Sequence, residues 1–222
     1  MKKHNLLTIF KIIVCCLAFF CIPALTDVLS RIAESRTIAL TVSISTSAMF
    51  LIFANHQLAA LHFKRFLQNL KENLVYVVFS AVFVCAAYLL SKYFFQFQIE
   101  HIDLEILKNY PFFAPLVVIT YTFSYAFCYN ILFKLITDYI PIHSEPLVTI
   151  LLSGVLFTLY LSTSQFALVP LLKQQFDSTL YIKGLIANFF PAVCCSYCYN
   201  QTRSVVPMTL GLSLASLIMM FI

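Results

Sequence analysis

Charge, glycine and tryptophan are scarce in this sequence. Only 10% of its 222 residues are charged, three are glycine and none is tryptophan, whereas 61% are hydrophobic. A water-soluble domain of this length cannot bury so much apolar surface, so the composition excludes an ordinary soluble protein. No P-loop, dinucleotide-binding fingerprint or Gly-x-Ser-x-Gly motif is present, which removes the commonest sequence signals of an enzyme.

Carboxylates and histidines are absent from the middle of the apolar runs. The nine acidic residues all fall in expected loops or at helix ends: Asp27, Glu34, Glu72, Glu100, Asp103, Glu105, Asp138, Glu145 and Asp177. The histidines are placed in the same way: His4, His56, His62, His101 and His143. A proton-coupled transporter, or an acid–base enzyme acting at membrane depth, usually needs an ionisable group inside a span. The sequence therefore argues against both classes.

The eight cysteines do not form a recognisable metal or disulfide framework. Five of them lie inside apolar runs, where a thiol behaves as a small hydrophobic group: Cys15, Cys16, Cys21, Cys85 and Cys128. The other three, Cys194, Cys195 and Cys198, form a Cys-x-x-Cys pattern within an apolar helix. No second cysteine pair or nearby histidine completes a zinc ligand set, so we predict no metal site and no cofactor.

Long apolar runs are what this sequence has in quantity. A helix that crosses a bilayer needs about 20 mostly apolar residues. The sequence contains six or seven such runs, at about 6–25, 37–58, 74–90, 112–136, 146–161, 180–198 and 205–222, with a weaker run at 166–172. They are continuous rather than alternating, which disfavours a barrel. Because backbone groups in lipid must be paired internally, we predict an all-α, polytopic transmembrane helix bundle with six to seven spanning helices.

Basic residues near the ends of the runs predict the orientation. The start Met1-Lys-Lys-His resembles a signal peptide, but its apolar run is long and no small-x-small cleavage site follows, so a retained helix is favoured. A cytoplasmic N-terminus places eight basic residues inside: Lys2, Lys3, Lys11, Lys64, Arg65, Lys71, Lys134 and Arg203. It places five outside, Arg31, Arg36, Lys92, Lys108 and Lys173, with Lys183 ambiguous. This bias predicts a bacterial inner-membrane protein with its N-terminus in the cytoplasm.

The chain is expected to form one membrane domain over residues 1–222. Two N-terminal helices would occupy 1–60, and the core bundle would occupy 74–222. Between them, residues 61–73 carry apolar side chains at helical spacing and basic side chains on the other side. Such a segment is expected to lie in the headgroup plane with membrane lipid as its partner, although a plain helical linker has the same pattern. The net charge of +5 requires no nucleic acid.

From residue 107 onward the chain resembles the CAAX-protease and bacteriocin-processing family of intramembrane proteases, called CPBP or Abi. The matching segments are 107–113, 131–135, 151–157 and 199–207. The family carries its chemistry on the motifs Glu-Glu-x-x-x-Arg and Phe-x-x-x-His and on a His-x-x-x-Asn-like pair in the last helix. The resemblance implies a helical bundle in which these motifs meet at one site.

The catalytic side chains of that family are missing here. The resemblance places the motif positions at Ser124, Tyr125, Tyr129, Phe157, Leu161, Gly211 and Ala215. Of the family's motif residues only the phenylalanine is retained. The tyrosines at the other positions ionise at about pH 10, so no residue remains that could activate water at neutral pH. The resemblance therefore implies a pseudoenzyme without a catalytic residue.

A polar patch remains on an otherwise apolar helix. The candidate binding residues are Ser124, Tyr125, Tyr129 and Asn130, with Thr158, Tyr160 and Asn188 as expected neighbours. They either form interhelical hydrogen bonds that stabilise the bundle or line a vestigial cavity for a peptide or lipid.

Three functions follow from these expectations. The first is an inactive CPBP-like protein that binds another membrane protein or a peptide, in an immunity or regulatory role. The second is an active protease with displaced catalytic residues, for which His143 and Glu145 are the candidates. The third is a small membrane transport component.

Overall fold

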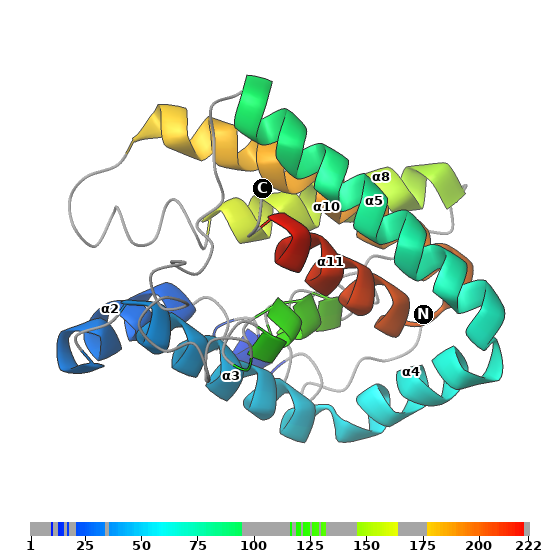
Figure 1. Ribbon diagram of the computed structural model, residues 1–222, viewed down its shortest axis with the longest axis horizontal. Coiled ribbons are helices and arrows are strands. Elements are labelled where there is room, and N and C mark those ends of the chain that lie inside the picture. The colour runs from blue at the N-terminus through cyan, green and yellow to red at the C-terminus, as the bar shows by residue number, and fades with distance from the viewer. Residues whose placement is uncertain are drawn as a thin grey trace.

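The fold is known from a computed structural model that describes about two thirds of the chain. It describes residues 10, 13–15, 17, 21–33, 36–94, 116, 119–120, 122–124, 126–128, 130–131, 146–163 and 177–219. All regular elements among these residues are helical, as the sequence predicts. The labelled helices are α2 (Ile22–Ala33), α3 (Arg36–Ala54), α4 (His56–Gln68), α5 (Leu70–Phe94), α8 (Pro146–Ser162), α10 (Ser178–Thr202) and α11 (Val206–Met219) (Figure 1).

Within the part of the chain that the structure describes, two helices are long and apolar enough to cross a membrane, α5 and α10. Each has 25 residues, which is about 37 Å of helix at 1.5 Å per residue. A third span arises if Ile38–Ala54 and Ala59–Gln68 are one broken helix, which bends by 87°. The apolar helices α8 and α11 have 17 and 14 residues, fewer than the roughly 20 that a straight span needs.

The boundaries of α10 follow from local capping. The Asp177 carboxylate accepts hydrogen bonds from the backbone N–H groups of Thr179 and Leu180, at 2.8 and 3.2 Å, which satisfies two donors of the first turn. At the other end Arg203 adopts a left-handed conformation, with φ of 52°, and its N–H donates to the Tyr199 carbonyl. The chain therefore turns sharply before α11 begins.

Among the helix pairs of the described bundle, two bring a glycine against the neighbouring helix. Helices α5 and α11 run in the same direction, because Gly211 lies against Val77 and Ser80 while the Ala215 carbonyl accepts from Cys85, one turn further along both helices. Helices α8 and α10 run in opposite directions, with Gly154 against Val193. Small residues at both contacts let the helix backbones approach, as is usual within membranes.

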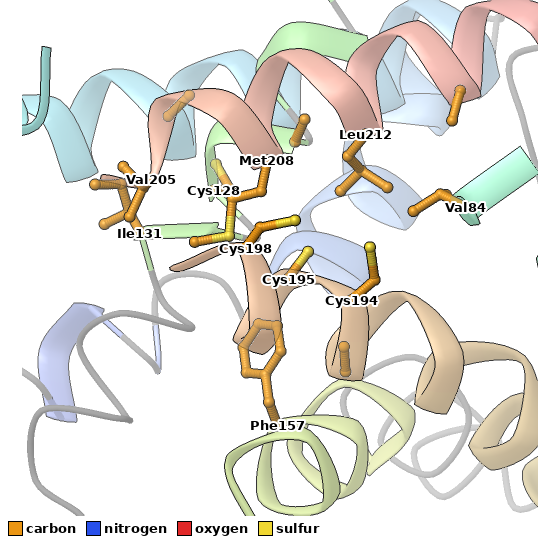
Figure 2. Packing of buried hydrophobic residues seen from close by; sticks show 14 of the residues in the cluster. Val84, Cys128, Ile131, Phe157, Cys194, Cys195, Cys198, Val205, Met208 and Leu212 are labelled. Atoms are coloured by element: carbon orange, nitrogen blue, oxygen red, sulfur yellow. The ribbon is translucent and has the colours of Figure 1, made fainter. Parts of the chain in front are cut away.

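The described core draws residues from α3, α5, α8, α10 and α11 and from the helical segment around residues 126–131. Phe157 of α8, Cys195 of α10 and Leu212 of α11 are almost fully buried and belong to one apolar cluster. Figure 2 shows Phe157 directed toward the α10 cysteines, with Met208 and Leu212 of α11 on the opposite side of these cysteines. Cysteine side chains thus fill a helix junction that larger residues would hold apart.

The N-terminal boundaries differ from those expected. Residues 22–33 form a separate helix, α2, in a region expected to join two spanning helices. Pro23 is its second residue, where the missing N–H costs nothing, and an exposed Asp27–Arg31 ion pair of 3.3 Å joins successive turns. The predicted amphipathic segment 61–73 is divided at Asn69, between α4 and α5.

Candidate functional site

The motif positions implied by the family resemblance lie in the interior wherever the structure describes them. Ser124 is helical and buried, and Phe157 has no exposed surface. Gly211 and Ala215 are buried on α11. Tyr125, Tyr129 and the side chain of Leu161 lie outside the described residues.

Several of these positions converge although they are far apart in the sequence. Phe157 and Ala215 belong to the same apolar cluster as Ala126 and Cys128, which are helical neighbours of Ser124. The Ser213 hydroxyl hydrogen-bonds to the Thr122 hydroxyl at 3.3 Å and joins α11 to that helical segment. The positions that can be located are buried in the described bundle, and the expectation that all of them meet around one site stays a prediction.

Space is lacking at Gly211, where the resemblance would place a catalytic histidine. A Cβ at this position would overlap the Ser80 hydroxyl and would come within 2.9 Å of the Ser80 Cβ and the Val77 carbonyl oxygen. The Val77 oxygen belongs to the α5 backbone, and the Ser80 Cβ lies one bond from it, so neither atom can move without the helix. No side chain larger than hydrogen fits unless α5 moves away from α11.

The polar candidates differ in how their hydrogen-bonding groups are used. The Thr158 hydroxyl donates to the Gly154 carbonyl of its own helix at 2.7 Å. Asn130 is fully buried, and its amide nitrogen donates to the Ala126 carbonyl at 2.8 Å. The Asn130 side-chain oxygen is buried, and none of the residues that the structure describes hydrogen-bonds to it. A buried acceptor of this kind carries a cost of about 1–3 kcal/mol until a donor reaches it.

One interhelical hydrogen bond involves a residue expected to border the patch. The Asn188 amide on α10 donates to the Ser162 hydroxyl on α8 at 3.2 Å, and both side chains are buried. This contact supports the interpretation that part of the polar patch stabilises helix packing. The side chain of Tyr160, the other expected neighbour, lies outside the described residues.

His62 is a buried residue that the sequence interpretation placed at a helix end. It lies within α4 and has no exposed surface, with its ring centroid 6.2 Å from that of Tyr199. Its backbone carbonyl accepts a hydrogen bond of 2.9 Å from the Ser204 hydroxyl. The sequence feature that could have indicated the burial of His62 is its spacing of four residues from Phe66, which is also buried. This spacing places both residues on one helix face.

Ionisable groups are rare in the described interior. The buried polar side chains are serine, threonine and asparagine together with His62, and the described carboxylates Asp27, Glu72 and Asp177 are partly or fully exposed. Within the same ranges no three residues of the types His, Cys, Asp and Glu form a group that could hold a metal ion. His143 and Glu145 lie outside them. The described site can therefore pack and hydrogen-bond a ligand, but it offers no carboxylate base.

Comparison of the chain with known protein families, curated proteins and solved structures finds no match. The described fold and site by themselves define a helical protein with two candidate membrane spans, or three if the bent pair is one. Its interior is uncharged and rich in small hydroxyl and thiol side chains.

Proposed function

We propose that this chain is a polytopic membrane protein that binds a membrane partner or peptide without cleaving it, as an inactive relative of the CPBP proteases. The observation that supports this most directly is the contact between Gly211 and Ser80, because it fills the position where the family's last catalytic histidine would stand. Ser124, at the position of a catalytic glutamate, is buried in the same region and carries no carboxylate.

We further propose six or seven spans in a bacterial inner membrane, with the N-terminus in the cytoplasm. The support is the length of the apolar runs together with the two long apolar helices, α5 and α10. Both ends of α5 carry a lysine, Lys71 and Lys92, as is expected where a span reaches the two headgroup layers.

The partner is proposed to lie against the helical segment that contains Ser124. Leu116, Ile119 and Phe123 recur at helical spacing on this segment and are all exposed, with Leu116 64% and Ile119 55% accessible. The Phe123 ring stacks on that of Phe127, with centroids 6.3 Å apart, which presents a continuous aromatic surface. An apolar stripe beside a buried polar interior fits a transmembrane helix or an apolar peptide as partner.

Photo-crosslinking tests the binding part of the proposal. A benzophenone amino acid in place of Phe123 is expected to give one defined adduct with a protein or peptide in native membranes. The same amino acid in place of Phe53, an exposed residue of α3, serves as the control and is expected to react with lipid only. Lipid adducts alone at position 123 would refute the proposed surface.

Proteolysis assays test the inactive part. The purified full chain, offered prenylated peptides and leader peptides in detergent, is expected to leave them intact. Cleavage that disappears in the His143→Ala or Glu145→Ala variant would overturn the proposal in favour of a protease with displaced catalytic residues.

A further inference from the structure

Helix α4 is tied to the turn between α10 and α11, although the two are far apart in the sequence. The Arg65 guanidinium donates to the Arg203 carbonyl at 3.1 Å, across 138 residues. The Ser204 hydroxyl donates to the His62 carbonyl at 2.9 Å, across 142 residues. These two bonds hold the cationic residues Arg65 and Arg203 at the same end of the bundle.

A basic cluster results at this end. Its members, Lys64, Arg65, Lys71 and Arg203, are all exposed. Glu72 is the one acidic residue in the described segments 56–76 and 199–210, so four cations and one anion leave a local charge of +3. Such a surface attracts anions.

The same end of the bundle exposes an apolar edge. His62 and Phe66 turn the buried face of α4 toward the protein, whereas the neighbouring Phe63 and Leu67 are 55% and 54% exposed. The helix pair that contains α3 and α4 bends by 87°. The axis of α4 is therefore nearly perpendicular to that of α3. Figure 1 shows α4 at the edge of the molecule, beside the beginnings of α5 and α11.

We propose that the basic cluster binds the phosphate headgroup of an anionic phospholipid, with Phe63 and Leu67 inserted among the acyl chains below it. The guanidinium groups of Arg65 and Arg203 present planar donors that match phosphate oxygens. The lysines add unspecific attraction, and each basic residue near a membrane surface increases the preference for anionic lipid by about fivefold. Arg203 belongs to this site only through the tertiary contact with α4, and the site is independent of whether the protein is proteolytically inactive.

The absence of tryptophan from the chain makes a direct measurement possible. A Phe63→Trp variant of the full chain carries a single tryptophan beside the basic cluster, which can be excited at wavelengths where the 12 tyrosines do not absorb. Reconstituted into bilayers that contain dibrominated phosphatidylglycerol or dibrominated phosphatidylcholine, its quenching gives the relative binding constant of the two lipids. We expect a preference for phosphatidylglycerol of about fivefold or more, decreasing as added salt screens the charges.

Variants in this background separate the tertiary site from a simple basic helix. Arg203→Gln is expected to reduce the preference severalfold. Arg203→Lys is expected to retain only part of it, because lysine keeps the charge but not the planar pair of donors. Lys92→Gln, at the opposite end of α5, is the matched control and should leave the preference unchanged. Equal quenching by both lipids, or no effect of Arg203→Gln, would overturn the proposal.

Two further measurements complete the test. Unchanged tryptophan emission in unbrominated lipid and an unchanged elution volume show that a variant is folded. If Arg203→Gln fails this check, Arg203→Asn replaces it, because asparagine tolerates the left-handed conformation of this residue. Inorganic phosphate added at constant ionic strength should not relieve the quenching. If it does, the site belongs to a soluble phosphate compound and the lipid assignment is wrong.

Discussion

At the scale of single residues, Gly211 lies at a contact between α11 and α5 where a Cβ would meet Ser80 and Val77. We predict that Gly211→Ala lowers the free energy of unfolding. The added methyl group forces α5 away from α11, which costs about 1–3 kcal/mol by overpacking. The replacement of glycine in a helix returns about 1 kcal/mol, so the net loss is expected to reach about 2 kcal/mol. Thermal unfolding of the purified protein in detergent measures it.

Two companion variants identify the cause. Ser80→Gly removes two of the three atoms that the new methyl group would meet, so it should restore part of the loss in the double variant. Leu214→Ala, at an exposed position on the same helix, should change the unfolding temperature little. An unchanged unfolding temperature for Gly211→Ala would show that α5 and α11 are less closely packed than described here.

Asn130 leads to a second prediction at this scale. Its side-chain oxygen is buried and has no hydrogen-bond partner within the described ranges, so Asn130→Leu, of similar volume, is expected to stabilise the isolated protein by about 1 kcal/mol. Asn188→Leu is the matched control and should destabilise it, because its amide bonds to Ser162. Thermal unfolding of both variants checks the opposite signs, and a marked loss of stability for Asn130→Leu would contradict the prediction.

At the scale of elements, α5 provides the test of membrane topology. We predict that Lys71→Cys reacts with a membrane-impermeant maleimide only after cells are permeabilised, whereas Lys92→Cys reacts in intact cells. The reason is that a helix of about 37 Å exceeds the roughly 30 Å hydrocarbon core and exposes its ends on opposite sides. Labelling of the parent chain, in which Cys21 is exposed, supplies the baseline. Reaction of both variants in intact cells would show that α5 does not cross the membrane.

At the scale of the whole molecule, the proposed relation to the CPBP proteases predicts that a few catalytic side chains are not enough to produce cleavage. We predict that a variant with Ser124→Glu, Tyr125→Glu and Leu161→His still fails to cleave prenylated or leader peptides. Residues of a catalytic site act as a unit, and the positions 129, 211 and 215 would still lack their partners. Peptide cleavage followed by mass spectrometry checks this, and turnover above that of the parent chain would contradict it.

The helical class and the positions of the longest described apolar helices could be predicted from the amino-acid sequence. The predicted runs 74–90 and 180–198 lie within α5 and α10, because apolar length and helix caps are local properties. The expected number of spans remains a prediction. The division of the amphipathic segment at Asn69 and the additional helix α2 were not predicted, since helix ends in such regions depend on the packing of neighbouring elements.

Which of these helices pack together, and which positions have space for a side chain, follows from the tertiary structure alone. No periodicity in the sequence pairs Gly211 with Ser80 or Arg65 with Arg203, since these residues are separated by more than a hundred positions. Helical patterning specifies which face of a helix is apolar, but not which helix covers it. Tertiary packing therefore fills the position at Gly211 and brings the basic residues of α4 and of the α10–α11 turn together. At the first contact small side chains let the helix backbones approach, and at the second hydrogen bonds fix how α4 and the turn are aligned.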